Sequence, residues 1–266
     1  MQRNHWDNRR MIKCKDEHKE FLLKHLKESP AFNCFLIGDL ENHSLEEDYL
    51  DIWVDSLKEP PQVYLLKYFD NYVVSGEGDM AAAYEVLKTQ EPRMLSGPQN
   101  SVTLLNQYLK SDQFQTLYLA EARSTSVERP KDIHSHLATP EDLDDLFDFQ
   151  KSIKEFSGSL SKREHYGQDI LKGSGRIAFI RDKERIVSTA QISAENSMNG
   201  MLIGVATDPH YRKKGYATVN ILAICEDMFK EGKSAILFYD NPEAGRLYKK
   251  LGFQDIGLWM MGNLSS

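Results

Sequence analysis

The chain has 266 residues, a formal net charge of −7 and 41% hydrophobic residues. This length suits one large domain or two smaller ones, and the hydrophobic content is sufficient for a buried core. An acidic chain binds poorly to nucleic acid or to an anionic membrane surface, so we expect neither partner.

The three cysteines are widely separated, at Cys14, Cys34 and Cys225, and none forms a C-x-x-C pair. This pattern argues against a disulfide framework and a structural zinc site, and we predict no bound metal. The N-terminus has no apolar core typical of a signal peptide, and no run is long and apolar enough to span a bilayer. We therefore expect a cytoplasmic protein.

The first half of the chain contains alternating strand and helix patterns. The segment 72–76 (YVVSG) predicts a strand, 80–89 a helix, 93–97 (RMLSG) a strand and 102–110 a helix. A polar stretch with a proline follows at 123–131. We place a domain boundary there, which gives predicted domains at 1–125 and 131–266.

The second half begins with a helix start at Thr139-Pro140-Glu141, and 159–171 predicts a weaker second helix. Two β-rich runs around a polar turn, at 176–181 and 185–193, predict a hairpin. The expected order then continues as a strand at 201–207, a basic turn, a helix with one apolar face, a strand at 234–239, a helix capped by Asn241 and ended by Gly252, and a final strand. Strand, turn, helix, strand, helix is also the order in the first half, which suggests an internal repeat.

The basic turn is Arg212-Lys213-Lys214-Gly215, between an apolar strand and an apolar helix. Such a turn leaves backbone N–H groups unpaired at a helix N-terminus, where phosphate oxygens bind well. A P-loop and a G-x-G-x-x-G dinucleotide motif are both missing from the sequence. The alternative interpretation is a solvated basic helix start.

Two ordered motifs give the turn a more specific meaning. The first is Arg212-Lys213-Lys214-Gly215-Tyr216-Ala217, and the second is N-x-x-A-x-x-x-Y-x-x-x-G-F from Asn241 to Phe253. Together they resemble the signatures of the GNAT superfamily of acyl-CoA-dependent N-acyltransferases. The resemblance is close over the last third of the chain, and from about Lys131 it extends only to the order of elements.

The resemblance implies an α/β fold of two GNAT-like domains, each a mixed central β-sheet flanked by helices, with a divergent N-terminal domain. It also implies that acetyl-CoA is the cosubstrate, with its pyrophosphate at the turn and its pantetheine arm along the preceding strand. The implied cofactor-binding residues are Val205, Ala206, Thr207, Arg212, Lys213, Lys214, Gly215, Tyr216, Ala217, Thr218 and Asn241. Asn241 could also act only as a helix cap, and the strand residues could be plain core.

Acyl transfer needs a hydrogen-bond donor for the oxyanion, which backbone N–H groups in 205–207 could supply, and a proton for the departing thiolate. Tyr248 is the predicted general acid, although a tyrosine on an apolar helix stripe is often only core. Glu195 is the best available candidate for the general base. The alternative interpretation is that Glu195 is only an exposed turn residue. Cys225 lies on a core stripe, His210 is expected to be solvated, and the pair His134 and His136 is interpreted as linker.

We therefore expect an acetyltransferase that acts on a primary amine of a small molecule or peptide. A non-catalytic acyl-CoA sensor or partner-binding protein is the alternative. A weaker similarity at Phe32–Glu41 resembles the N-terminal half of two-domain bacterial GNAT proteins. In the first-half turn, Glu77 and Asp79 replace the cations, so we predict a single coenzyme A site per chain.

Overall fold

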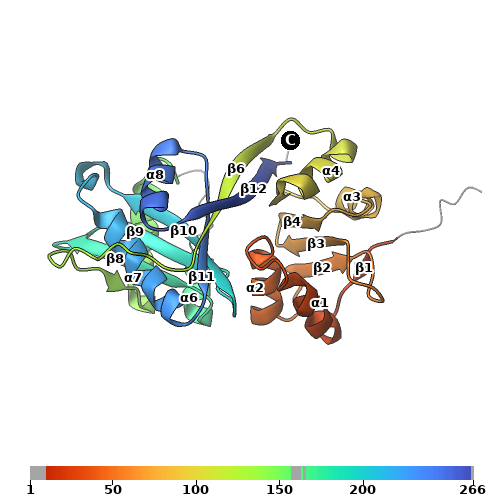
Figure 1. The fold of residues 1–266 in the computed structure, drawn as a ribbon, viewed down its shortest axis with the longest axis horizontal. Helices are drawn as coiled ribbons and strands as arrows, with labels where there is room; N and C mark the ends of the chain where they lie inside the picture. The colour runs from red at the N-terminus through yellow and green to blue at the C-terminus, as the bar shows by residue number, and fades with distance from the viewer. Residues whose placement is uncertain (1–9, 157–162, 164–165, 265–266) are drawn as a thin grey trace, which may run out of the picture. The chain divides into compact units, whose positions relative to one another are not determined.

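The computed structural model describes residues 10–156, 163 and 166–264, which form two compact units (Figure 1). Unit 1 contains the chain up to Tyr118 and from Gly257 onward, and unit 2 is Leu119–Ile256. The chain therefore passes between the units inside two strands, β6 (Phe114–Ala122) and β12 (Gln254–Asn263). The predicted domains 1–125 and 131–266 differ from these units at residues 119–125, which belong to unit 2, and at the end of β12, which belongs to unit 1, and they stay a prediction.

Unit 1 has a sheet in the order β1-β2-β3-β4-β5-β12. Its neighbours pair antiparallel except β4 and β5, which are parallel at three positions from Asn71↔Met94 to Val73↔Ser96. The other elements of unit 1 are β1 (Ile12–Lys13), α1 (Lys19–Leu26), α2 (Cys34–Asn42), β2 (Leu50–Val54), β3 (Val63–Tyr68), β4 (Asn71–Gly76), α3 (Ala81–Lys88), β5 (Met94–Pro98) and α4 (Gln99–Leu109), with a short 3-10 turn at Asp16–His18.

The two faces of this sheet are covered by different helices because side chains alternate along a strand. Leu50, Ile52 and Val54 of β2 pack with the apolar residues of α1 and α2. Trp53, between them in the sequence, packs in a second cluster with residues of α3 and α4 such as Leu105. Unit 1 is thus a three-layer α/β structure.

Unit 2 has a sheet in the order β6-β11-β10-β9-β8-β7. Strands β7 to β10 pair antiparallel, whereas β10 and β11 are parallel at three positions from Asn199↔Ser234 to Met201↔Ile236. Its elements are β7 (His136–Leu137), α5 (Leu143–Ser152), α6 (Gln168–Lys172), β8 (Arg176–Asp182), β9 (Arg185–Ser193), β10 (Asn199–Thr207), α7 (Tyr216–Lys230), β11 (Ser234–Tyr239) and α8 (Pro242–Lys250), with 3-10 turns at Pro140–Asp142 and Pro209–Tyr211.

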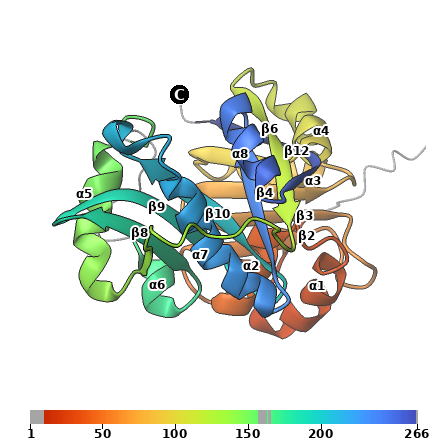
Figure 2. The same ribbon diagram turned by 60° about the vertical axis from the view of Figure 1, so that its left-hand side comes forward.

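Helix α7 lies across one face of the unit 2 sheet, and α5 packs on the other (Figure 2). Ala178 and Ala190 pack with α7, whereas Ile177 and Phe179 pack with Leu146 and other residues of α5. The small alanines on the α7 side let that helix approach the strands closely. Each face therefore has its own buried cluster, and both clusters meet at β10.

The predicted α/β architecture, with mixed sheets flanked by helices, is confirmed. The repeated order is also present, as β4-α3-β5-α4 in unit 1 and β10-α7-β11-α8 in unit 2. The linker interpretation of His136 is wrong, because His136 lies in the edge strand β7, where it pairs with Phe179 of β8. Much of the helix predicted at 159–171 lies outside the described residues, and α6 covers its C-terminal part.

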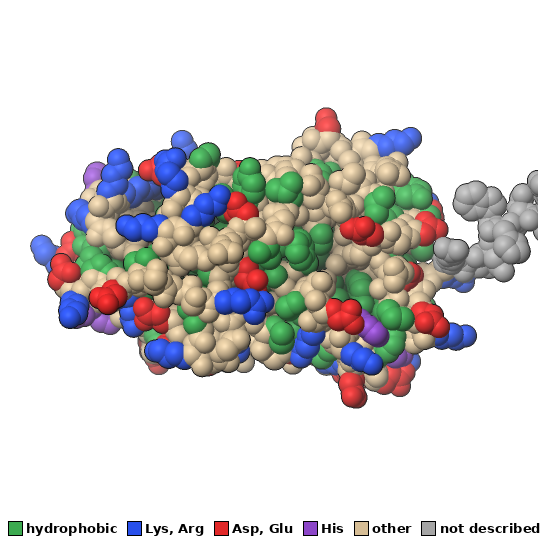
Figure 3. All heavy atoms as spheres, in the orientation of Figure 1, with side chains coloured by type: hydrophobic (Ala, Val, Ile, Leu, Met, Phe, Trp, Pro, Cys, Tyr) green, Lys and Arg blue, Asp and Glu red, His purple; other side chains and the backbone are tan. Residues whose placement is uncertain are grey.

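Neither described unit contains a helix long and apolar enough to cross a membrane. The described residues also include no cluster of histidine, cysteine or carboxylate side chains that could hold a metal ion. Acidic and basic side chains are interspersed on the face shown in Figure 3, rather than gathered into a field of one sign.

Candidate functional site

The basic turn between β10 and α7 has the backbone conformation of an anion-binding nest. Lys213 has φ = 63° and Gly215 has φ = 85°, and a positive φ is uncommon for a residue other than glycine. Left-handed residues in a turn allow successive N–H groups to point into one concavity. The sequence motif did not predict the left-handed conformation of Lys213.

The first amides of α7 are available to a ligand. Gly215 stands at the N-cap and offers no side-chain cap, and the first helical bond is donated by Val219 N–H to the Gly215 carbonyl at 3.0 Å. Within the described residues, no acceptor is found for the N–H groups of residues 213–218. A Cβ placed on Gly215 would have only Ile133 Cδ1 nearby, at 3.9 Å. The space above the helix start is open, and the helix dipole makes it favourable for an anion.

The three cations of the turn have different environments. Arg212 donates from Nε to the Thr207 carbonyl at 3.1 Å and from Nη2 to Glu155 at 2.8 Å. Lys214 lies over the ring of Tyr211, with 4.6 Å between Nζ and the ring centroid. Lys213 is exposed. Only Arg212 is thus held in place by hydrogen bonds, and one of its partners is a carboxylate that a bound anion would have to displace.

Strand β10 carries a β-bulge immediately before the turn. Ile203 is opposite Gln191 and Ala206 is opposite Thr189, so β10 has one extra residue. Gly204, with φ = 59°, has the left-handed conformation typical of the first residue of such a bulge. The extra residue reverses the faces of the strand, because Leu202 packs in the cluster with α7 whereas Ala206 packs in the cluster with α5.

Beyond the bulge, one edge of β10 borders a pocket instead of a strand. The recorded pairing with β11 ends at Met201↔Ile236, while β10 continues to Thr207. The pocket has a volume of about 410 Å³, and Val205, Ala206 and Thr207 line it. The other lining residues are Ile153, Glu155, Phe156, Tyr211, Arg212, Lys213, Gly215, Tyr216, Ala217, Thr218, Ala244 and Leu247. The strand end and the helix start predicted from sequence to bind one ligand therefore share one cavity.

Tyr248 is on α8 beside this pocket but is not among its lining residues. Its ring contacts Tyr239 and Phe253, each at 5.9 Å between centroids, and it packs with Val205 against the same apolar cluster. Burial raises the pKa of Tyr248 above its ordinary value. No hydrogen-bond partner of its hydroxyl is present in the described part of the chain. Tyr248 is therefore a packed core residue that also lies close to the end of β10.

Asn241 caps α8: its side chain accepts a hydrogen bond from Glu243 N–H at 2.8 Å. The cap interpretation is confirmed, and Asn241 does not line the pocket. His210 is exposed, as expected. Cys225 is buried on the core face of α7, and burial raises the pKa of its thiol to about 12, which makes it inert.

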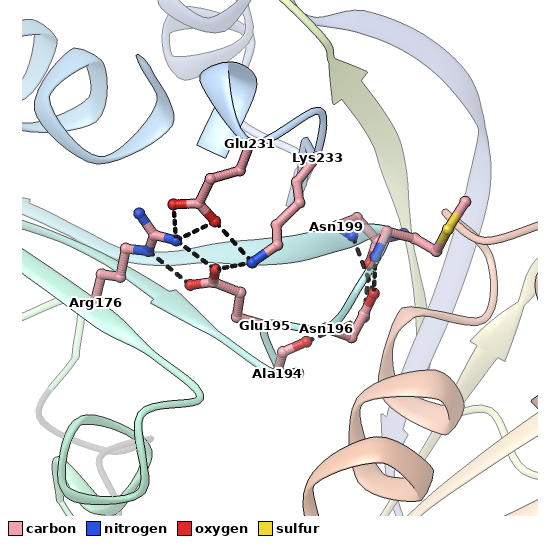
Figure 4. A network of polar contacts seen from close by, with 8 residues as sticks. Arg176, Ala194, Glu195, Asn196, Asn199, Glu231 and Lys233 are labelled. Carbon is pink, nitrogen blue, oxygen red and sulfur yellow. Dashed lines mark hydrogen bonds and ion pairs between the residues drawn. The ribbon is translucent and has the colours of Figure 1, made fainter. Parts of the chain in front are cut away.

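Glu195 is placed elsewhere in unit 2. It is only 7% exposed and accepts hydrogen bonds from Arg176 at 2.6 and 2.8 Å and from Lys233 at 2.7 Å, while Glu231 completes the network (Figure 4). Burial acts to raise the pKa of Glu195, but the hydrogen bonds and charges of Arg176 and Lys233 outweigh it and lower the pKa.

The network is also remote from the pocket. Glu195 precedes the Asn199 end of β10, whereas the pocket is at the Thr207 end, roughly 20 Å away along the strand. Glu195 is therefore neither the exposed turn residue of the alternative interpretation nor close to the predicted site. Its environment is that of a structural carboxylate joining the starts of β8 and β11 to the end of α7.

In the corresponding turn of unit 1, two backbone amides already have acceptors. Gly78 N–H donates to the Gln62 carbonyl at 3.2 Å, and Ala81 N–H donates to the Asp79 side chain at 3.0 Å, so these amides are already satisfied. A Cβ on Gly97 of β5 would be 2.1 Å from the Val74 carbonyl of β4. The two parallel strands of unit 1 thus stay in contact just beyond their last recorded pair.

The sequence analysis did not identify the pocket residues that directly follow α5. Ile153, Glu155 and Phe156 line the pocket from the segment after this helix, and no motif marks them. Gln150 did carry a signal, since it is a polar residue at a core position of a helix, and it is 2% exposed. Buried polar side chains generally have specific partners, and Gln150 donates from Nε2 to the Gly204 carbonyl at 3.4 Å.

Residues 141–253 match the sequence model of the Acetyltransferase (GNAT) family. Residues 141–253 are a GNAT domain. No curated protein matches the chain.

Solved structures share the fold of the whole chain at low identity. A GCN5-related N-acetyltransferase-like protein from Streptococcus suis is 17% identical, with a TM-score of 0.61 over 94% of this chain and 100% of that chain. A tandem GNAT protein from the clavulanic acid biosynthesis pathway is 12% identical, with a TM-score of 0.60 over 94% and 96%. A Drosophila protein is 13% identical, with a TM-score of 0.66 over 97% and 99%. The fold of the whole chain, and not of residues 141–253 alone, is thus shared with these solved structures.

The ion pair of Glu155 with Arg212 leads to a first prediction. Glu155→Gln removes a carboxylate that competes with an anion for Arg212, so affinity for coenzyme A should increase. Both side chains are largely exposed, at 58% and 45%, so the gain should be no more than about 1 kcal/mol, or about five-fold. Isothermal titration calorimetry with coenzyme A measures it.

Glu128→Gln is the matched control, because Glu128 is exposed in the same unit and the described residues offer it no ion pair. Equal affinities for wild type and Glu155→Gln, or a weaker Glu155→Gln complex, would contradict the prediction.

Proposed function

We propose that the GNAT domain transfers an acetyl group from acetyl-CoA to a primary amine of a small molecule or peptide. One observation carries the proposal: the pocket joins the open amides at the start of α7 to the bulged end of β10. The first part suits a pyrophosphate, and the second offers free backbone groups to an extended arm. Membership of the GNAT family supports the reaction class.

The residues present fit coenzyme A. Amides of residues 213–218 would bind the pyrophosphate in a space that a side chain at Gly215 would invade, and Arg212, Lys213 and Lys214 would add positive charge. Backbone groups of Val205 and the N–H of Thr207 would pair with the amides of the pantetheine arm, whereas the Thr207 carbonyl already accepts from Arg212. Tyr216, Ala217 and Thr218 line the same cavity, which supports their assignment to the cofactor site.

The chemistry at the strand end follows from its donors. As the neutral amine attacks, the electron pair of the thioester carbonyl moves to oxygen, where a backbone N–H beyond the bulge stabilises the charge. The carbon–sulfur bond then breaks, and Tyr248 donates its proton to the thiolate. Because burial raises the Tyr248 pKa, the phenol is protonated throughout the neutral range. The amine releases its own proton to water, water returns a proton to the Tyr248 phenolate, and the proposal does not use Glu195.

The alternative function is an acyl-CoA sensor without turnover. The two functions differ in whether thiol is released. A screen of amine acceptors with acetyl-CoA, followed by release of free thiol, separates them: steady release with any amine supports the enzyme, and tight binding without release supports the sensor.

The anion site is tested by Gly215→Glu. The new carboxylate would occupy the space over the helix start, so acetyl-CoA affinity should fall at least about 100-fold, or about 2.7 kcal/mol. Gly232→Glu is a matched control at the other end of α7, because Gly232 is also exposed, has φ = 78° and would have no atom within 4 Å of an added Cβ. Calorimetry should show normal binding for the control, and equal losses in both variants would indicate strain rather than a lost site.

The general acid is tested by Tyr248→Phe, which keeps the ring contacts and removes the hydroxyl. Turnover should fall by roughly 100-fold with little change in acetyl-CoA affinity. In the wild type, the alkaline loss of kcat that belongs to this group should occur above the ordinary tyrosine pKa of about 10, because a raised pKa keeps the acid protonated to higher pH.

Tyr239→Phe is the control, since it removes the hydroxyl of a neighbouring tyrosine, which donates a hydrogen bond to Asp255 at 2.6 Å. Full activity of Tyr248→Phe across the pH range would reduce Tyr248 to packing.

The number of sites is tested by titration with coenzyme A. We expect one site per chain, because Glu77 and Asp79 place negative charge at the unit 1 turn and the amides of Gly78 and Ala81 already have acceptors. Glu77→Ala should leave the stoichiometry and affinity unchanged, whereas Gly215→Glu should abolish binding. A stoichiometry of two, or loss of binding in Glu77→Ala, would be incompatible with this assignment.

A further inference from the structure

The carbonyl of the bulge glycine, Gly204, accepts hydrogen bonds from two buried side chains. Thr189 Oγ1 of β9 donates at 3.0 Å, and Gln150 Nε2 of α5 donates at 3.4 Å. Thr189 is completely buried and Gln150 is 2% exposed. Two different elements thus direct side-chain donors at one backbone oxygen, next to the residues that line the pocket.

Holding this carbonyl also determines the direction of the next amide. The described residues contain no cis peptide bond, so the Gly204–Val205 peptide is trans and planar. In such a peptide the carbonyl and the following N–H point in opposite directions. With the Gly204 carbonyl turned toward Thr189 and Gln150, the Val205 N–H must point away from them.

The strand pairing identifies the edge that β10 presents beyond the bulge. Asp208 N–H donates to the Val187 carbonyl of β9 at 2.9 Å. Backbone groups alternate along a regular strand, so those of Ala206 also face β9, whereas those of Thr207 face the opposite edge, which the pocket borders. Val205 lies within the bulge, where this alternation is interrupted, so the direction of its N–H follows from the held Gly204 carbonyl. Val205 lines the pocket, and its N–H, turned away from Thr189 and Gln150, is directed toward this cavity.

A glycine at this position needs such restraint. Gly204 has φ = 59°, and glycine can adopt many other conformations at little cost. A Cβ here would be 2.6 Å from Gln150 Nε2 and 2.9 Å from Gln191 Cδ, so a larger residue would displace these side chains and would be strained at this φ. The peptide orientation must then be fixed by partners, and the described hydrogen bonds to the carbonyl come from Thr189 and Gln150.

We infer that Thr189 and Gln150 are positioning residues that aim the Val205 N–H at the thioester carbonyl oxygen. The inference rests on the proposed function and identifies which backbone donor serves it. As the carbon–nitrogen bond forms, the carbonyl electron pair moves to oxygen and the Val205 N–H donates to that oxygen. When the carbon–sulfur bond breaks, the pair returns and the donor is ready for another cycle. Neither positioning residue exchanges a proton.

A test that needs no amine acceptor uses the ¹H–¹⁵N resonance of the Val205 amide. Its shift should differ between saturating acetyl-CoA and saturating coenzyme A, because only the former has the acyl carbonyl. In Thr189→Val, which removes the hydroxyl at similar volume, this difference should fall to less than half. In Thr189→Ser, which keeps a hydroxyl, it should largely return.

Turnover provides the second measurement, with an amine that the wild type accepts. Thr189→Val should lower kcat at least about 10-fold, less than complete loss of an oxyanion donor, with KM for acetyl-CoA changed less than two-fold. Thr189→Ser should recover most of kcat. Gln150→Met should have a smaller effect, since its hydrogen bond is longer. The pH profile of kcat should keep its shape, because no titrating group is altered.

Ser188→Ala controls for loosening of β10. The Ser188 hydroxyl donates to the neighbouring Ala206 carbonyl at 3.0 Å and is equally buried. It should lower thermal stability as Thr189→Val does but reduce kcat less. An equal fall of kcat in both, or a Val205 shift difference that Thr189→Val leaves intact, overturns the inference alone. Failure of the wild type to bind acetyl-CoA overturns the proposed function and the inference together.

Discussion

One extra residue in β10, between Ile203 and Ala206, changes which groups face the pocket. Without the bulge, Leu202 and Ala206 would share a face of the sheet; with it, they pack in opposite clusters. The bulge therefore changes the direction of the backbone groups at the end of β10, beyond its last pair with β11. A regular strand would have exposed a different set of backbone groups to the start of α7, so the geometry of the cavity depends on this irregularity.

The two ends of β10 have opposite electrostatic characters. At the Asn199 end, four charges of both signs neutralise one another in the Arg176, Glu195, Glu231 and Lys233 network, partly out of water. At the Thr207 end, three cations surround open amides, and one of them, Arg212, is paired with Glu155. The first arrangement rigidifies the sheet and has no charge left for a ligand. The second retains positive potential, which is what an anion site needs.

Comparison of the units indicates how a repeated scaffold can lose a site. Both contain a strand, a turn, a helix and a parallel strand in the same order. In unit 1, the Asp79 side chain accepts from Ala81 N–H and the Gln62 carbonyl accepts from Gly78 N–H, so these two amides are not available to a ligand. In unit 2, Gly215 leaves the helix start uncapped. The difference is a matter of which donors remain unpaired, since the topology around the turns is the same.

Local chemistry was readable from the sequence. Apolar periodicity predicted β10, α7, β11 and α8, and the glycine, proline and asparagine positions predicted where the helices begin and end, because these signals act over a few neighbouring residues. The Arg212–Ala217 motif predicted an anion-binding turn for the same reason. Contacts between distant segments were not readable. Sequence analysis left Glu195 as a candidate base, although Lys233, 38 residues away, and Arg176 hold it in an ion-pair network. Likewise, the alignment of Thr189 and Gln150 on one carbonyl depends on how β9 and α5 pack around the bulge. Burial, pKa and donor direction arise from such long-range packing, which a linear pattern of residue types does not encode.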